Sequence, residues 1–334
     1  MVVCLGKCGT KIMETKRILI LGGNGFIGSN LSRALLSSGH EIHIGIRVNS
    51  NIWRLEDIKN SLQIHYYEDI SDRGVADFVK KIKPMVVVNA IGLVGKLQDN
   101  LLQQWESNFL SLIHLVNASL SSNVERLVHM GSSFEYGAAS LKYRRLGEEV
   151  ECVPVSEYGL AKLFETNYSS YLNRKEEIPV TVLRIFNVFG EYESKERLIP
   201  EVVLRAIDGK TIELHNPMGE RDFIWIRDVT SAIIKIIDDF GNDDFNDIFN
   251  VGTGKSARVE DVAKIIVRET GVRSKIFNQG SDIRSENYIP GPIADISKIQ
   301  RVVGWKPKYN LETAIRETVQ WFKENRDKYK SIYQ

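Results

Sequence analysis

The segment from Glu157 to Lys162 contains two residues that could act together in proton transfer. Its sequence is EYGLAK, in which Tyr158 and Lys162 stand four positions apart. At that spacing in a helix the two side chains lie on one face, one turn apart. A lysine ammonium beside a tyrosine stabilises the phenolate and lowers the pKa of the phenol from about 10. Tyr158 is therefore a candidate general acid or base, although YxxxK by itself is common on helices.

Two serines upstream add hydroxyl groups to this pair. Ser132 and Ser133 lie in HMGSSFEYG, directly after the apolar run RLVHM, which is typical of a strand. In doubly wound sheets the ligand-binding crevice lies at the carboxyl ends of the strands. We expect Ser132 to hydrogen-bond the substrate oxygen whose proton Tyr158 transfers.

A glycine-rich segment near the N-terminus is typical of a dinucleotide site. In LILGGNGFIGSNL the residues Gly22, Gly25 and Gly28 are three apart, after an apolar run and before an amphipathic stretch. A strand, a tight glycine turn and a helix N-terminus allow the backbone to approach a pyrophosphate, which free N–H groups then bind. The alternative is a tight turn without a ligand, but the strand and helix context favours a cofactor loop.

The end of the second predicted strand affects the choice between NAD(H) and NADP(H). An acid there would bind the adenosine ribose hydroxyls, but in HEIHIGIRVNSNIWRL the position holds no acid and Arg47 follows it. Arginine pairs with a ribose 2′-phosphate, and Ser50 and Arg54 can assist, so NADP(H) is favoured and NAD(H) is the alternative. The other interpretation of Arg47 is a solvated surface charge. After the third predicted strand, Asp69 and the neighbouring Ile70 are placed to meet the adenine.

The elements that position these residues alternate along the chain. From Arg17 to Phe189, short runs rich in β-branched residues alternate with amphipathic segments, which is typical of βαβ units around a parallel sheet. We predict an α/β fold with a doubly wound parallel (Rossmann) sheet over residues 16–189, joined by a segment near 220–254. Residues 190–334 mainly form a smaller C-terminal α/β lobe for the substrate. Residues 1–15 are expected to be a flexible leader, in which Met13 is an alternative start.

Composition argues against several classes of protein. The chain has 334 residues, 43% of them hydrophobic, and a net charge of +1 without a basic tract, so no nucleic-acid partner is expected. The N-terminal segment MVVCLGKCGTKIMETK is interrupted by Lys7 and Lys11 before any apolar stretch long enough for a membrane helix or signal peptide. Three cysteines are too few for a disulfide scaffold, and the six histidines lack ligand spacing. We expect a cytoplasmic protein that binds neither a membrane nor a metal.

Further motifs cover most of the chain. They are NAIG at residues 89–92, RIFNVFG at 184–190, ERDFIWIRDV at 220–229, FNVGTG at 249–254 and ADISKIQRVVGWKPK near the end. Together with the glycine loop, the serine and YxxxK, these motifs resemble those of extended short-chain dehydrogenase/reductases (SDRs), the NAD(P)-dependent nucleotide-sugar epimerase/dehydratase family. The resemblance runs from about Lys16 to about Arg326.

The resemblance implies a role for each matching residue. The catalytic triad is matched by Ser132, Tyr158 and Lys162, and the lysine also holds the nicotinamide ribose. The cofactor residues are Gly22, Gly25, Phe26, Ile27 and Gly28 in the glycine loop, with Asn89 and Ala90 in NAIG. The residues for the nucleotide-diphosphate sugar are Ser133, Asn187, Arg221 and Arg284, whose two arginines clamp the diphosphate. Members of the group often pair through the helices that follow the fourth strand and hold YxxxK, so a homodimer is expected.

Two departures from the group reduce the number of reactions that we expect of this chain. Dehydratases carry an Asp-Glu pair after the catalytic hydroxyl residue, where this chain has Ser133 and Phe134, so a 4,6-dehydratase is disfavoured despite the nearby Glu135. The Arg47 segment is similar to the NADP-binding segment of GDP-mannose 4,6-dehydratases and of some sugar 4-ketoreductases. We predict NADPH-dependent reduction of an NDP-4-keto-6-deoxyhexose. The alternatives are an NDP-sugar 4-epimerase with tightly held NAD and a non-catalytic NADP(H)-binding regulator, which would need no triad.

Overall fold

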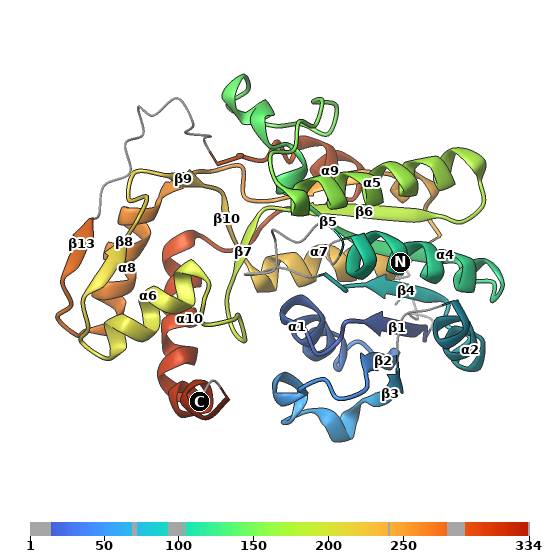
Figure 1. Cartoon of the computed structure of the whole chain (residues 1–334), viewed down its shortest axis with the longest axis horizontal. Coiled ribbons are helices and arrows are strands. Elements are labelled where there is room, and N and C mark those ends of the chain that lie inside the picture. The colour runs from blue at the N-terminus through green and yellow to red at the C-terminus, as the bar shows by residue number, and fades with distance from the viewer. Residues whose placement is uncertain are drawn as a thin grey trace, which may run out of the picture.

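A seven-stranded parallel sheet forms the centre of the molecule (Figure 1). The computed structural model describes residues 15–68, 72–92, 102, 105–239, 241–278 and 291–332. The strands follow the order β11-β6-β5-β4-β1-β2-β3. Their bounds are β1 (Arg17–Leu21), β2 (Glu41–Arg47), β3 (Gln63–Tyr67), β4 (Val86–Asn89), β5 (Arg126–Ser132), β6 (Val180–Ile185) and β11 (Ile248–Val251). The doubly wound parallel sheet predicted from the alternating pattern is confirmed.

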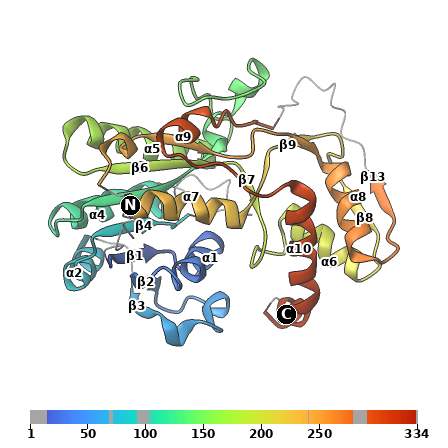
Figure 2. The ribbon, with the colours of Figure 1, turned by 180° about the vertical axis from the view of Figure 1, so that it is seen from behind.

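The strands send alternate side chains into two separate cores. In β1, Ile18 and Ile20 belong to the core on one face and Leu19 and Leu21 to the core on the other. Because strand side chains alternate in direction, a strand covered on both faces needs apolar residues at every position. The first face is covered by α1 (Phe26–Leu35) and α7 (Ile226–Asp238), which pack on each other. The second is covered by α2 (Asp72–Ile82), α4 (Ser111–Leu120) and α5 (Glu157–Lys175) (Figure 2).

The strand order reverses direction between β1 and β4. These two strands pair in parallel, with Leu21 beside Asn89 at their carboxyl ends. The chain leaves β1 toward β2 on one side and leaves β4 toward β5 on the other. In open α/β sheets, ligands bind in the crevice that opens at such a switch point. The glycine loop and NAIG, which follow these strands, therefore border one crevice.

A smaller α/β lobe lies beside the sheet, at the left of Figure 1. It contains α6 (Leu198–Ile207), β8 (Ile212–Leu214), α8 (Val259–Thr270), β13 (Ile276–Asn278) and α10 (Leu311–Glu324). The strands β8 and β13 pair in parallel, and the three helices pack on one another. Two small sheets connect the lobe to the rest: β7 (Asn187–Phe189) with β10 (Phe223–Trp225), and β9 (Glu220–Arg221) with β12 (Ala257–Arg258). Two short helices, α9 (Ser297–Val302) and α11 (Arg326–Ile332), follow β13 and α10.

The chain crosses between the two parts more than once. After β7 and α6 it returns to the sheet, where α7 packs on α1 and β11 pairs with β6. The Asp228 carboxylate at the start of α7 accepts backbone hydrogen bonds from Lys308 and Tyr309, at 2.8 and 3.3 Å. These bonds fix the segment before α10 against the sheet domain. Within the described ranges no helix has the length and apolar character needed to span a membrane.

Candidate active site

The glycine loop brings the start of α1 directly onto the turn after β1. Gly22 has a positive φ of 73°, which L side chains rarely adopt. A Cβ built on Gly28 would lie 2.4 Å from the Gly22 carbonyl oxygen, so only glycine permits this contact. The turn is closed by a hydrogen bond from the Gly25 N–H to the Gly22 carbonyl, at 2.9 Å. The predicted tight turn and close helix approach are both present in the structure.

The N-terminus of α1 fits an anionic group. Gly25 is the N-cap and supplies no side-chain acceptor, and the first turn contains no acidic residue. The N–H groups of the first turn, which include those of Phe26 and Ile27, therefore have no side-chain cap at the positive end of the helix dipole. A dinucleotide pyrophosphate suits these donors, and the absence of side chains leaves room for it. The loop residues thus fit the cofactor that the sequence predicts.

The end of β2 presents an arginine of the kind predicted for a 2′-phosphate. Arg47 is exposed, and its guanidinium forms no ion pair with any described residue. The Ser50 N–H donates to the Arg47 carbonyl at 3.0 Å, so both residues share one turn. Arg54 has different partners, because its Nε donates to the Tyr192 carbonyl at 2.7 Å and its Nη2 to Ser194 Oγ at 3.2 Å. Three other predicted residues, Asp69, Ile70 and Arg284, lie outside the described residues.

The serine and tyrosine of the triad are brought together by η4 (Ser133–Glu135) and the start of α5. Ser132 ends β5, and its Oγ accepts a hydrogen bond from the Phe134 N–H at 3.2 Å, so its own hydrogen stays available to a substrate oxygen. Tyr158 lies in the first turn of α5, after the N-cap Ser156. A Cβ on Gly159 would lie 2.5 Å from the Phe134 carbonyl oxygen. The glycine in YGLAK therefore allows α5 to contact η4.

The triad lysine is buried and fixed by two internal acceptors. Lys162 Nζ donates to the Met130 carbonyl at 3.1 Å and to Glu165 Oε2 at 2.8 Å. Burial lowers the pKa of Lys162, but Glu165, together with Tyr158 and Glu135, outweighs burial, so the pKa lies above its usual value. Lys162 is therefore an ammonium at neutral pH and can stabilise a phenolate at Tyr158.

The NAIG segment shapes the crevice through its backbone. The Asn89 side chain is buried, where Oδ1 accepts from the Ile91 N–H and Nδ2 lies 3.2 Å from His129 Nδ1. The Ala90 carbonyl lies against Gly22, since a Cβ on that glycine would be 2.7 Å from it. Asn89 thus holds the loop after β4, and Ala90 borders the glycine turn.

Glu135 does not face a substrate. Its Oε1 accepts from the Ser132 N–H at 2.8 Å and its Oε2 from Arg184 Nε at 2.7 Å. The side chain is fully buried, and burial raises the pKa of its carboxyl against the opposing effect of Arg184. Ser133 beside it is buried as well. The described part of η4 therefore offers no carboxyl group of the kind that water elimination requires.

Asn187 and Arg221 lie on the small sheets that link the two lobes. Asn187 starts β7, and among the described residues its buried Nδ2 has no hydrogen-bond partner. Arg221 ends β9, where its Nη1 donates to the Glu220 carbonyl at 2.8 Å. The carboxylates next to Arg221 have other partners: Glu220 pairs with Arg144, and Asp222 accepts from Thr253 and Gly254.

Two structural residues of the site were not assigned from the sequence. Asp222 is fully buried and binds the FNVGTG loop and the Ala294 N–H, which explains why an acid follows Arg221. Glu165 contacts Lys162 from three positions further along α5. The signal for Glu165 was its helical spacing, since residues three apart share a face.

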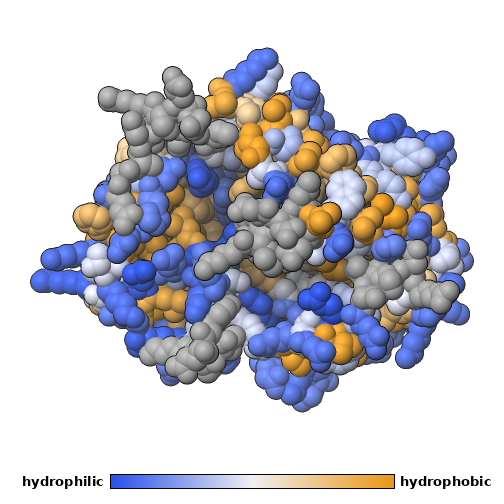
Figure 3. Space-filling model, in the orientation of Figure 1, coloured by the Kyte–Doolittle hydropathy of each residue, from blue (hydrophilic) through white to orange (hydrophobic). Residues whose placement is uncertain are grey.

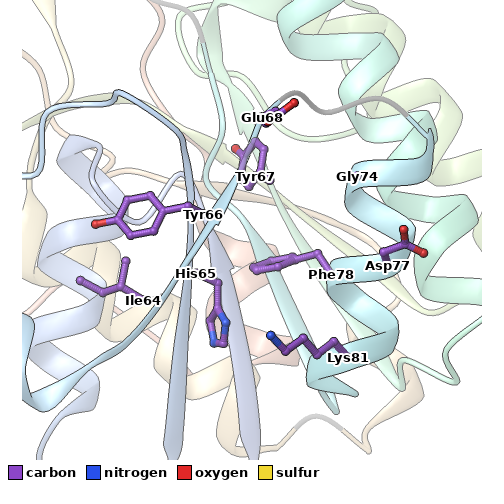
Figure 4. A pocket seen from close by; sticks show the side chains of 9 residues that line it. All are labelled: Ile64, His65, Tyr66, Tyr67, Glu68, Gly74, Asp77, Phe78 and Lys81. Carbon is purple, nitrogen blue, oxygen red and sulfur yellow. The ribbon is translucent and has the colours of Figure 1, made fainter.

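The face shown in Figure 3 is hollowed between the sheet and the smaller lobe. A separate groove of about 650 Å³ lies on β3 and α2 (Figure 4). His65, Phe78 and Lys81 line it, and His65 stacks on His43. Burial, followed by the charges of His43 and Lys81, lowers the pKa of His65. None of the triad residues lines this groove, so it is distinct from the candidate active site. No cluster of three metal-ligating side chains occurs in the described ranges.

Comparison with known proteins places this arrangement in a family. A family model described as "NAD dependent epimerase/dehydratase family" matches residues 18–252. The chain belongs to this family. It is an enzyme of the extended SDR type, as the motifs predict.

The reported relatives cover more than nine tenths of the chain. A UDP-glucose 4-epimerase from Lactobacillus helveticus is 26% identical over 339 residues, covering 92% of this chain and 98% of that protein. The UDP-glucose 4-epimerase of Thermotoga maritima, solved with UDP-glucose, superposes with a TM-score of 0.82 at 21% identity, covering 92% and 99% of the two chains. A dTDP-glucose 4,6-dehydratase from Bacillus anthracis, solved with NAD, has a TM-score of 0.82 at 23% identity, covering 95% and 99%. The two structures show a shared fold.

Proposed function

We propose that the protein interconverts two nucleotide-diphosphate hexoses that differ in configuration at carbon 4, with an NAD that it keeps bound. The composition of the candidate site carries this proposal. One titratable hydroxyl, that of Tyr158, lies a helical turn from a charged lysine, and the carboxyl group on η4 is paired with Arg184. Such a site can move a proton on and off one oxygen, and its described residues supply no further acid and base of the kind that dehydration requires. Relatives named as UDP-glucose 4-epimerases support the same reaction.

Each side chain of the triad has a separate role in this reaction. A nicotinamide dinucleotide, held by the glycine loop and Lys162, would supply the hydride chemistry at carbon 4 of the sugar. Tyr158 accepts the proton of the sugar hydroxyl as the carbonyl forms and returns it after the sugar has turned. Ser132 donates its hydrogen to the same oxygen, and the Lys162 ammonium stabilises the phenolate form in which Tyr158 must be before it accepts the proton and after it has returned it.

Polar groups near the small linking sheets would hold the rest of the substrate. The unpartnered Nδ2 of Asn187 is buried, and an unpaired buried amide is unfavourable unless a ligand satisfies it. Arg221 has the planar fork that matches a diphosphate, and we assign the second arginine of the clamp to Arg284.

A second candidate function is NADPH-dependent reduction of an NDP-4-keto-6-deoxyhexose. The observation in its favour is the exposed Arg47 at the end of β2, with Ser50 in the same turn. A guanidinium there suits a 2′-phosphate, which NAD lacks. A reductase exchanges its cofactor at every turnover, whereas an epimerase keeps it, so cofactor retention separates the two.

We further propose that the enzyme acts in the cytoplasm as a homodimer. The surface of α5 exposes three large apolar side chains, those of Leu160, Phe164 and Tyr171. Phe164 also packs on Trp105, which precedes α4, with ring centroids 5.1 Å apart. An apolar area spread over neighbouring helices is typical of a surface that another protein covers.

Turnover of a panel of sugar nucleotides tests the reaction. Purified protein is incubated with UDP-, dTDP- and GDP-hexoses without added cofactor, and proton NMR follows the configuration at carbon 4. We expect one pair of carbon-4 epimers to interconvert, and Tyr158→Phe to slow this by about 10² to 10⁴ through loss of the acid–base hydroxyl. Tyr66→Phe, on an exposed tyrosine of β3, is the control and should not slow turnover. Consumption of NADPH with a 4-keto sugar, and no epimerisation, would support the reductase instead.

A further inference from the structure

Beneath the triad lysine runs a chain of buried polar side chains that the proposed reaction does not use. Glu165 Oε2 accepts from Lys162 Nζ and from His129 Nε2, both at 2.8 Å. On the far side of the histidine, Nδ1 lies 3.2 Å from Asn89 Nδ2. All four side chains are buried, at 0 to 2% exposure. These side chains connect α5 to the middle of β5 and the end of β4.

The direction of each hydrogen bond follows from the asparagine. Asn89 Oδ1 accepts from the Ile91 N–H, so its Nδ2 donates toward His129. Nδ1 of His129 therefore accepts and Nε2 carries the hydrogen that Glu165 receives. One carboxylate oxygen thus accepts two donors, while Oε1 has no partner among the described residues. Burial raises the pKa of Glu165, but the Lys162 ammonium and the hydrogen bonds from Lys162 and His129 outweigh it, so the pKa lies below its usual value.

Burial alone would favour the neutral amine of Lys162. An ammonium removed from water loses its hydration, and lysines buried without a counterion titrate several units below their usual pKa. Glu165 supplies that counterion. A lysine side chain is also flexible, and its three donors can point in many directions. Two of them are used on Glu165 and the Met130 carbonyl, which leaves one for the site.

Tyr158 and Glu135 also raise the pKa of Lys162, but among the described residues only Glu165 gives its ammonium a carboxylate hydrogen bond. On η4, Glu135 is neutralised by Arg184 of β6 at 2.7 Å. From β5, His129 presents its Nε2 hydrogen to the same Glu165 oxygen. From η3 (Trp105–Leu110), the uncharged Asn108 borders the same space, since a Cβ built on Gly92 would lie 3.9 Å from both Asn108 Oδ1 and Lys162 Nζ.

We propose that Glu165 is a positioning residue that keeps Lys162 protonated and fixes its ammonium at one point of the cleft. The inference rests on the proposed function in one respect only, that Lys162 acts by stabilising Tyr158. Glu165 itself touches neither substrate nor cofactor and acts through the lysine. Lys162 stays protonated because of the negative charge of Glu165, and not only because of its shape.

Titration of Lys162 tests this without any substrate. Protein labelled with ¹³C at lysine Cε is followed by NMR from neutral to high pH, and the Lys162 signal is assigned from its loss in Lys162→Arg. We expect Lys162 to stay protonated to above pH 10 in the parent, and to titrate at least about one unit lower in Glu165→Gln, which keeps the shape but not the charge. Glu165→Asp should restore most of the difference. Glu177→Gln, which removes an exposed charge after the same helix, is the control. An unchanged Lys162 titration in Glu165→Gln would overturn the proposal.

Urea denaturation provides a second test, in case Glu165→Gln folds poorly. If Glu165 balances the lysine charge, Lys162→Met added to Glu165→Gln should recover much of the lost stability, because no unpaired charge is then buried. Additive losses would overturn the proposal. Neither measurement depends on turnover, so a failure here leaves the proposed reaction untouched, and the absence of epimerisation leaves these results intact.

Discussion

Glu135 and Arg184 form a buried ion pair directly behind Ser132, the candidate catalytic serine. Glu135 Oε2 accepts from Arg184 Nε at 2.7 Å while Oε1 accepts from the Ser132 N–H. Arg184 Nη1 also donates a hydrogen bond to the Tyr136 hydroxyl, at 3.2 Å. The carboxylate thereby fixes the backbone of Ser132, and it does so from inside the protein. The pair is thus a structural support of the site.

Removing one partner of this pair should destabilise the fold. Glu135→Gln leaves the Arg184 charge buried without a counterion, and we expect a loss of about 3 to 5 kcal/mol in the free energy of unfolding. Urea denaturation measures it. The matched control is Glu201→Gln, which breaks the exposed pair with Arg205 on α6 and should cost less than about 1 kcal/mol. A stable Glu135→Gln protein that had lost only turnover would instead make Glu135 a catalytic acid.

The close contact in the glycine loop predicts a cofactor-binding defect. Gly28→Ala places a Cβ 2.4 Å from the Gly22 carbonyl oxygen, so the start of α1 must move away from the turn. We expect dinucleotide affinity to fall at least about tenfold, about 1.4 kcal/mol, by calorimetric titration. Gly241→Ala, where a Cβ meets nothing within 4 Å, should bind as the parent does. Unchanged affinity in Gly28→Ala would contradict the assignment of the loop.

Much of this site could be predicted from the sequence because its signals are local. The apolar runs define strands covered on both faces, and the spacing in the glycine loop and YxxxK defines a turn and a helix face. The partners of these residues could not be predicted in the same way. Glu135 meets Arg184 from 49 positions away and Asp222 meets the FNVGTG loop from 31 positions away, contacts that only the folded sheet creates.

Arg54 is another residue whose partner could not be predicted from the sequence. Its type and position after β2 suggested an anion-binding arginine, and its role with a 2′-phosphate stays a prediction. Its Nε donates to the carbonyl of Tyr192, 138 residues away, in the loop after β7. A guanidinium has the same donors for a phosphate as for a carbonyl, so the sequence alone does not tell which it meets.

The loop after β7 contains a carboxyl group that should make stability depend on pH. Glu193 is buried, its nearest cation is Arg197 at 3.9 Å, and burial raises its pKa to about 8. Because the native state holds this proton more tightly than the unfolded chain, stability falls as pH rises from about 4.5 through about 8. Glu193→Gln, which is always neutral, should raise Tm at pH 9 and change it little at pH 5. Equal Tm shifts at both pH values would contradict the titration.

The exposed apolar surface of α5 predicts the oligomeric state. We expect a dimer in sedimentation equilibrium, because Phe164 is 42% exposed beside the exposed Leu160. Phe164→Asp should place a charge in the dimer interface and shift the population to monomer. Leu141→Asp changes an even more exposed residue, at 61%, on a different surface and should leave the dimer intact. A monomeric parent protein would remove the proposal.

Identification of the nucleotide released from freshly purified protein tests the central proposal most directly. The protein is denatured without added cofactor, and the supernatant is analysed by chromatography and mass spectrometry. An epimerase that returns its hydride to the sugar keeps its cofactor, so we predict about one NAD per chain. Protein that releases no dinucleotide, and that NADPH stabilises more than NADH, would contradict the epimerase and favour the reductase built around Arg47.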